Sequence, residues 1–174
     1  FVFDPLDGTK NFIHGNGYFA VSIGLMHKKE IIAGATYNPI LNEFFWAHKG
    51  EGAWINNSRL RVSQRNHLEG SMFATGVQIK HPDILSRGIA QASHLLHQTS
   101  VRIMGSAALD LANVASGKFD GFWASRLNLW DIIAGMILVK EAGGVCQNLQ
   151  GKDFNPLEDE TLLASSAAIS QEFQ

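Results

Sequence analysis

The sequence predicts an α/β protein, on two observations. Runs rich in β-branched and aromatic residues, separated by turn residues, fill the first third of the 174-residue chain and indicate an antiparallel meander. Further along, similar runs alternate with segments of helical length and period, which is typical of an α/β unit. A polar stretch at residues 63–70 separates the two patterns. We therefore expect the C-terminal part of a first α+β domain at residues 1–66 and a second α/β domain at residues 67–174.

Strand and turn signals predict the elements of the meander. The apolar run Phe1-Val2-Phe3 opens the chain and indicates a strand that is buried on both faces. Lys28-Lys29-Glu30 is a polar turn between two apolar runs, which indicates a hairpin. The elements expected here are strands at residues 1–5, 18–27, 31–37, 43–48 and 50–55, and a short helix at residues 9–13.

Helix start and stop signals organise the second part. Pro82 suits the first turn of a helix, and Gly117 and Gly143-Gly144 each end another. The expected helices are residues 82–98, 107–115, 130–142 and 168–174. The expected strands are residues 71–75, 101–104, 119–124, 145–149 and 161–165. The four tryptophans, at positions 46, 54, 123 and 130, are expected in the core.

Composition excludes several classes of protein. Hydrophobic residues make up 45% and charged residues 17%, an ordinary balance for a globular domain. The net charge of −2 gives no basic field for nucleic acid or an anionic membrane, so neither partner is expected. No apolar run approaches the roughly 20 residues that span a bilayer. The single cysteine, Cys146, rules out an internal disulfide framework and fits a reducing cytoplasm.

The most informative motif is Asp4-Pro5-Leu6-Asp7-Gly8-Thr9-Lys10-Asn11-Phe12. It places two carboxylates where a strand ends and a helix begins. Such carboxylates can hold a hard divalent cation such as Mg²⁺, and the N–H groups of the new helix can hold a phosphate beside it. Asp-Pro-x-Asp-Gly is also good turn chemistry. The apolar run that leads into it and the length of the string favour phosphoryl chemistry over a surface turn.

Asp131 is the best candidate for a further metal ligand. It stands near the start of an otherwise apolar helix, after Trp130 and before small residues that would hold it rigidly. A helix N-cap is the simpler interpretation of the same position. Gly105-Ser106-Ala107-Ala108 opens another helix, where small residues let the backbone approach a ligand and Ser106 can cap. An ordinary strand-to-helix turn is the alternative there.

Taken together, these segments resemble the inositol monophosphatase family. The segments that carry the resemblance occur in the family's order across nearly the whole chain. They are the Asp4–Phe12 string, Gly52-Ala53-Trp54-Ile55-Asn56, Gly105-Ser106-Ala107-Ala108, and Leu129-Trp130-Asp131-Ile132-Ile133-Ala134-Gly135 leading to Glu141-Ala142-Gly143-Gly144.

The resemblance implies a layered α-β-α-β-α sandwich and a phosphatase that uses Mg²⁺. Asp4 would bridge metal ions, and the carbonyl of Leu6 would bind one of them. Asp7 and Asp131 would complete the second metal site, and Asp131 would also face the substrate. Asp4 and Asp7 would form the catalytic set together with Thr9.

The resemblance also implies which residues bind the substrate. The backbone N–H groups of Gly8 and Thr9 would hold the phosphate, and the Thr9 hydroxyl would orient the attacking water. Gly105, Ser106 and Ala107 would line the pocket for the alcohol part.

Two departures from the family pattern stand out. The family carries a Gly-Glu-Glu segment upstream of its Asp-Pro motif, with a Glu that binds metal and activates water. The present chain starts after that point, so we expect an N-terminally truncated fragment that is incomplete for catalysis. The family's inositol-type enzymes also have a sugar-binding Glu where this chain has Ala124. Arg126 would then contact an anionic substrate instead, or serve as an exposed structural residue.

The expected function is hydrolysis of a small sugar or polyol phosphate, such as inositol monophosphate, by metal-activated water attack. The alternatives within the family are a fructose bisphosphatase, a histidinol-phosphate phosphatase and a nucleoside bisphosphate phosphatase. A non-catalytic binding protein that retains the fold is the alternative from another class. The resemblance also implies a homodimer, and we expect it in the cytoplasm.

Overall fold

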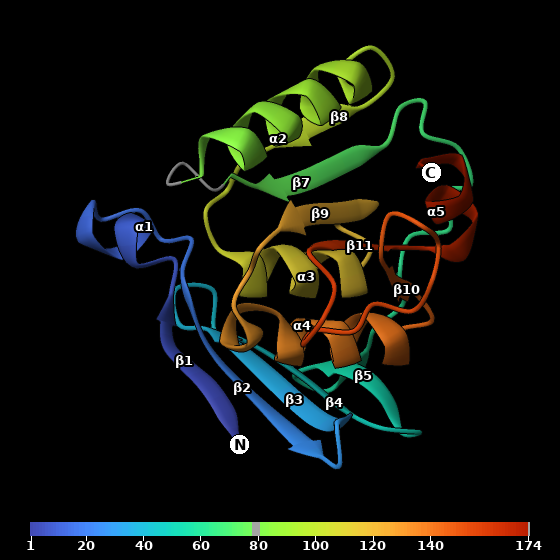
Figure 1. Ribbon diagram of the computed structural model, residues 1–174. Helices are drawn as coiled ribbons and strands as arrows, with labels where there is room; N and C mark the ends of the chain where they lie inside the picture. Colours follow the sequence, from blue (N-terminus) through green and yellow to red (C-terminus); the bar gives the residue numbers. More distant parts are fainter. Residues whose placement is uncertain (78–80, 174) are drawn as a thin grey trace.

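The computed structural model describes residues 1–77 and 81–173, which form two β-sheets with helices between and outside them (Figure 1). The α/β fold class predicted from the sequence is confirmed. The predicted last helix is present as α5 (Ala167–Phe173), while its final residue, Gln174, lies outside the described residues. Among the helices of the described part, none is long and apolar enough to cross a bilayer.

The first sheet is the predicted meander, with its strands in chain order and every neighbouring pair antiparallel. Its members are β1 (Val2–Asp7), β2 (Ala20–His27), β3 (Glu30–Asn38), β4 (Glu43–His48), β5 (Gly52–Ile55) and β6 (Ser58–Arg59). The short helix α1 (Thr9–Ile13) leaves the sheet between β1 and β2 (Figure 1).

The prediction that the opening strand is buried on both faces is wrong for the described residues. β1 is the edge strand of its sheet. Phe1 is 85% exposed and Phe3 is 63% exposed, whereas Val2 is half-buried. The cause is the two-residue period of a strand, which turns Phe3 to the face opposite Val2. That outer face is covered by no helix of the described residues (Figure 1).

The second sheet is mixed and follows the predicted alternation of strand and helix. It contains β7 (Met72–Gly76), β8 (Ser100–Arg102), β9 (Gly121–Ser125), β10 (Val145–Gln147) and β11 (Thr161–Ser165), in the order β10-β11-β9-β7-β8. β7 runs parallel to both β8 and β9, and the remaining pairs are antiparallel. Helix α2 (Pro82–Leu95) lies on the outer side of this sheet (Figure 1).

Helices α3 (Ala107–Ala115) and α4 (Leu129–Glu141) lie between the two sheets (Figure 1). Every residue of α4 from Ile132 to Val139 is buried, which fits a helix covered on all sides. Glycine makes this approach possible, because a Cβ on Gly34 of β3 would lie 2.7 Å from the Cα of Ala134. Helix α4 and strand β3 therefore pack with their backbones nearly in contact.

One apolar cluster reaches from the first sheet through these helices into the second. It includes Phe45 of β4, Leu111 of α3 and Phe122 of β9. Trp123 is buried in a second cluster, and Trp46 and Trp54 are half-buried and stacked with ring centroids 5.9 Å apart. Trp130 is 47% exposed, so the prediction of a core position is wrong for it. Trp130 is the second residue of α4 and lies before the buried stretch of that helix, which begins at Ile132.

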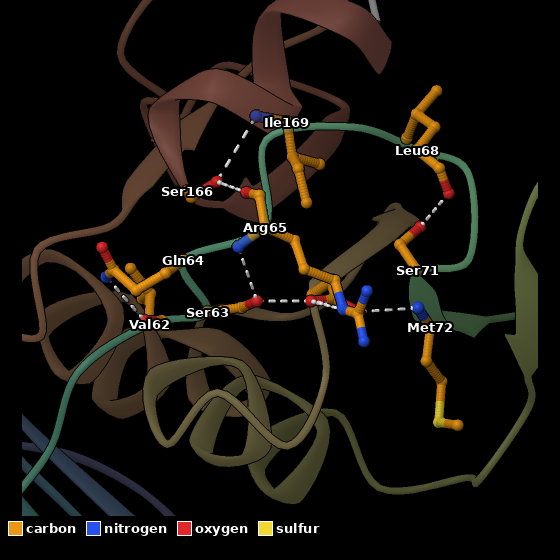
Figure 2. Close-up of polar contacts among 10 residues, drawn as sticks. Val62, Ser63, Gln64, Arg65, Leu68, Ser71, Met72, Ser166 and Ile169 are labelled. Carbon is orange, nitrogen blue, oxygen red and sulfur yellow. Dashed lines mark hydrogen bonds and ion pairs between the residues drawn. The ribbon is translucent and has the colours of Figure 1, made fainter.

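The predicted boundary between domains falls in the segment that joins the sheets, shown in Figure 2. Asp120 lies in the loop from α3 to β9, directly before β9, and its carboxylate holds this segment. Its Oδ1 accepts a hydrogen bond from the Ser63 hydroxyl and lies 3.6 Å from Arg65 Nε, and its Oδ2 accepts one from the Met72 N–H at 2.7 Å. The Ser166 hydroxyl donates to the Arg65 carbonyl at 3.3 Å. The connection is thus fixed at several points, and the division into two domains stays a prediction.

Candidate metal centre

The end of β1 turns both carboxylates of the first motif to one side. Residues three apart on a regular strand face opposite ways. Here Asp4 opposes Ser22 while Asp7 opposes Ala20, so three steps on β1 match two on β2, with an irregularity between them. This extra residue returns Asp7 to the side of Asp4. The Leu6 N–H bridges the turn by donating to Asp4 Oδ1 at 2.9 Å.

The turn that follows requires glycine. Gly8 has a φ of +83°, and a Cβ there would lie 2.9 Å from the carbonyl oxygen of Tyr18. The Thr9 hydroxyl donates to the Leu6 carbonyl oxygen at 2.9 Å. Both lone pairs of the Thr9 hydroxyl oxygen therefore remain able to accept hydrogen bonds.

Asp131 joins these residues from the first turn of α4. Its Oδ2 accepts hydrogen bonds from the Asn128 N–H at 2.9 Å and from Asn128 Nδ2 at 3.1 Å. One carboxylate oxygen each of Asp4, Asp7 and Asp131 lies within 4.8 Å of the other two. Asp131 therefore organises the start of α4, as the simpler interpretation has it, and its role as a metal ligand stays a prediction.

Helix α3 anchors Asp7 from the second half of the chain. The Ser106 hydroxyl donates to Asp7 Oδ2 at 2.6 Å, and the Ala108 N–H donates to the same oxygen at 2.8 Å. The Ser106 oxygen also accepts from the Leu109 N–H at 3.3 Å, which makes Ser106 the N-cap of α3, as predicted. One serine thus caps the helix and holds the carboxylate.

Burial sets the electrostatics of this cluster. Desolvation, with smaller contributions from the charges of Asp131 and Asp4, raises the pKa of Asp7 to about 6 against the two hydrogen bonds from α3. Desolvation also raises the pKa of Asp131. Crowded, partly buried carboxylates are stabilised by a counter-cation, and an all-oxygen set suits a hard ion such as Mg²⁺. The residues present therefore fit the expected metal, although they do not identify it.

A cavity of about 200 Å³ opens beside the cluster. It unites two of the carboxylates with the small-residue segment singled out from the sequence. Its walls are Asp7, Gly76, Val77, Gly105, Ser106, Ala107, Asp110, Leu127 and Asp131.

Sequence reasoning missed Asp110, which is buried in α3 at the edge of this cavity. The Tyr18 hydroxyl donates to Asp110 Oδ1 at 2.7 Å and accepts from Asn113 Nδ2 at 2.9 Å. Burial raises the pKa of Asp110 to about 8, with a further contribution from the charge of Asp7. An acidic residue within the apolar helical run 107–115 is the signal that could have found it.

Asn11 was also missed as an anchor, although it stands in the first motif. Its Nδ2 donates to the carbonyl oxygens of Tyr18 at 2.7 Å and Met104 at 2.8 Å. It thereby ties α1 to the segment that leads into Gly105. Arg126, the other candidate from the sequence, directly follows β9 and donates through Nε to Glu160 Oε1 at 2.9 Å. The roles of Gly8, Thr9 and Leu6 toward phosphate and metal stay predictions.

Comparison with known proteins gives a consistent match. Residues 1–173 match the model of the inositol monophosphatase family. An inositol-1-monophosphatase of Caulobacter vibrioides is 44% identical over 172 residues, which cover 95% of this chain and 66% of the relative. A protein named Nus factor SuhB, of Haemophilus influenzae, is 40% identical over 173 residues, with 98% of this chain and 64% of the relative covered.

Solved structures agree with the sequence relatives. The inositol monophosphatase of Anabaena (Nostoc) superposes with a TM-score of 0.94 at 36% identity, over 99% of this chain and 71% of that one. The chain spans less than two thirds of the length of the two curated relatives, at 66% and 64%. Activity, substrate and partners of the whole protein therefore remain to be proposed.

Proposed function

This chain belongs to the inositol monophosphatase family, and from that premise we propose that the full-length protein hydrolyses small phosphate monoesters with the help of Mg²⁺. The observation that carries the proposal is the meeting of Asp4, Asp7 and Asp131, with one oxygen each within 4.8 Å. The cavity of about 200 Å³ beside them leaves room for a phosphate and part of an alcohol.

One set of residues in this chain would hold the metal, and another would place the water and the substrate. The carboxylates of Asp4, Asp7 and Asp131, with the Leu6 carbonyl, would hold Mg²⁺. Bound Mg²⁺ would lower the pKa of water and offset charge on the phosphate oxygens. The Thr9 hydroxyl donates a hydrogen bond to the Leu6 carbonyl oxygen. The Thr9 hydroxyl oxygen would therefore accept a hydrogen bond from the attacking water and orient that water.

The phosphate and the alcohol would be placed by backbone and small residues. The first N–H groups of α1, at Gly8 and Thr9, lack helical partners by geometry and would donate to phosphate oxygens. The cavity wall formed by Gly105, Ser106 and Ala107 would receive the alcohol. No covalent nucleophile is required, because water attacks the phosphorus directly in this scheme.

The substrate class we propose is a small sugar or polyol phosphate, such as inositol monophosphate. The name of the Caulobacter relative, an inositol-1-monophosphatase, supports it, and Ala124 in place of the family's sugar-binding Glu argues for a different preference within the class. Other family phosphatase activities, on fructose bisphosphate, histidinol phosphate or nucleoside bisphosphates, are the nearest alternatives. A cytoplasmic homodimer is part of the same proposal.

A non-catalytic binding role is the second candidate, and one observation favours it. A relative that is 40% identical is named as a Nus factor rather than as an enzyme. In that case the fold and the acidic cluster would serve a macromolecular partner, and the full-length protein would release no phosphate.

A substrate panel on the full-length protein separates these possibilities. Phosphate release is measured from inositol monophosphate, fructose bisphosphate, histidinol phosphate and a nucleoside bisphosphate, with Mg²⁺ and with excess chelator. We expect Mg²⁺-dependent release that is lost in Asp131→Asn and kept in Asp83→Asn, whose residue is exposed on α2. Absence of release from every substrate would favour the binding role.

A further inference from the structure

Two buried hydroxyls next to the metal centre lack partners. Ser22 of β2 is 1% exposed and Thr36 of β3 is fully buried. Neither Ser22 Oγ nor Thr36 Oγ1 has a hydrogen-bond partner among the residues that the structure describes. A buried donor left unsatisfied costs about 1–3 kcal/mol, and native proteins keep few of them. Two such donors side by side therefore call for a physical reason.

Both hydroxyls lie in one row with Asp4. Asp4 is paired with Ser22 across β1 and β2, and Ser22 is paired with Thr36 across β2 and β3. Directly opposite residues share one face of the sheet, with Cβ atoms about 4.5–5.5 Å apart. That face is the one turned to α4, because a Cβ on Gly24, two residues after Ser22, would meet Ile133. The row therefore runs from the metal centre into the sheet beneath α4.

We infer that Ser22 is a positioning residue for the metal ligand Asp4, and that Thr36 supports Ser22. In this arrangement the Ser22 hydroxyl donates to the Asp4 carboxylate, and the Thr36 hydroxyl donates to the Ser22 oxygen. A serine hydroxyl has one proton and two acceptor sites, so each member can be satisfied at once.

Asp4 has free acceptor sites for this hydrogen bond, and few other donors among the described residues hold its carboxylate in place. A carboxylate offers about four acceptor sites, and the Leu6 N–H occupies one of them on Oδ1. Asp4 is half-buried on an edge strand, whereas Asp7 is held by two donors from α3. A hydrogen bond from Ser22 would fix the direction of the Asp4 oxygens. Partners of this kind typically change metal affinity by roughly 10–100-fold when removed.

This inference rests on the proposed Mg²⁺ site, and titration calorimetry with Mg²⁺ on the full-length protein tests the two separately. We expect wild-type protein to bind Mg²⁺ and Ser22→Ala to bind it about tenfold more weakly. Ser71→Ala is the matched control, because Ser71 is equally buried but donates to the Leu68 carbonyl away from the site. It should lower thermal stability and leave Mg²⁺ affinity unchanged.

Thr36→Val tests the second bond without a change of shape. Its loss of Mg²⁺ affinity should be smaller than that of Ser22→Ala and should vanish when Ser22 is already alanine, because Thr36 acts through Ser22. Ser22→Cys keeps the side-chain shape with a weaker donor and replaces Ser22→Ala if the latter does not fold. Wild-type affinity in the folded Ser22 variant would overturn this inference alone. Wild-type protein that binds no Mg²⁺ would overturn the proposed function and this inference together.

Discussion

The Ser106 hydroxyl donates a 2.6 Å hydrogen bond to Asp7 Oδ2 across 99 residues of sequence. Asp7 ends a strand of the first sheet, and Ser106 caps a helix that lies between the sheets. The candidate metal centre therefore depends on how the two halves of the chain pack, and a single serine couples helix stability to carboxylate position.

Ser106→Ala should weaken both properties. It removes an N-cap and a bond to a buried carboxylate, so we expect a loss of about 1–3 kcal/mol in the free energy of unfolding. Mg²⁺ affinity should fall about tenfold, because Asp7 loses an orienting partner. Chemical denaturation and calorimetry measure the two effects. Ser116→Ala, at the other end of α3, is the control and should leave Mg²⁺ affinity as it is; an equal loss there would contradict a specific role for Ser106.

Asp7→Asn separates the metal role from the fold. The amide keeps the size of the side chain and removes a charge that burial disfavours, so the metal-free variant should be at least as stable as wild type near pH 7.5. Mg²⁺-dependent phosphate release should drop by about 100-fold or more, because the metal contributes several kcal/mol to the barrier. Near-normal release from a folded Asp7→Asn protein would remove Asp7 from the metal site.

Asp110 should make stability depend on pH. Its folded pKa of about 8 lies above the ordinary value of 3.8, so ionisation opposes folding. The contribution of Asp110 is therefore most favourable below pH 4, declines as pH rises, and is constant above pH 8. The slope between these limits is at most about 1.4 kcal/mol per pH unit. Urea denaturation of metal-free protein from pH 5 to 9 measures it.

Asp110→Asn is the control for this pH dependence. An uncharged amide can still accept the hydrogen bond of the Tyr18 hydroxyl, so the variant should unfold with a flatter pH profile and be more stable than wild type at pH 8.5. A wild-type slope in Asp110→Asn would mean that another group titrates.

Glycines at the contact between helix and sheet should differ in their tolerance of alanine. At Gly34 the new Cβ would lie 2.7 Å from the Cα of Ala134, so Gly34→Ala should cost about 1–3 kcal/mol and shift the helix that carries Asp131. At Gly88 of α2 the new Cβ meets nothing within 4 Å, so Gly88→Ala should stabilise by about 0.5–1 kcal/mol. Thermal melts compare the pair, and a stabilised Gly34→Ala would argue against backbone-close packing of α4.

The sequence predicted most elements and the meeting of the three carboxylates for different physical reasons. Strand and helix periods, with glycine and proline breaks, are local signals, and they located the meander and the buried helix α4. Asp4 and Asp7 stand in one contiguous string, so their convergence required only the bulge seen between them. Asp131 could be proposed because a carboxylate before a buried apolar run is unusual.

What could not be predicted depends on contacts between distant segments. The bond between Ser106 and Asp7 and the placement of Asp110 beside the cavity follow from the packing of α3 against the first sheet. The exposure of Phe1 and Phe3 follows from the outer face of the first sheet, which no helix of the described residues covers, and three apolar residues alone do not reveal that face. Unpartnered hydroxyls such as Ser22 appear only once register and burial are known.

Position 124 should control substrate preference. Ala124 is paired with Gly76, which lines the candidate cavity, and a Cβ on Gly76 would lie only 3.3 Å from the Cβ of Ala124. Ala124 itself is buried in the apolar cluster between the sheets. Because Gly76 has no side chain, we expect a longer side chain at position 124 to extend past it toward the cavity. A Glu there would accept hydrogen bonds from the hydroxyls of a bound polyol.

We therefore expect Ala124→Glu to raise kcat/KM for inositol monophosphate about tenfold relative to a phosphate ester without hydroxyls, such as 4-nitrophenyl phosphate. That factor corresponds to roughly one hydrogen bond to the substrate. Ala124→Leu adds comparable bulk without an acceptor and should lower both activities together. Since the Glu is acidic and close to the metal centre, Mg²⁺ is kept saturating for every variant. An unchanged ratio of the two substrates in Ala124→Glu would show that the alcohol part binds elsewhere in the cavity.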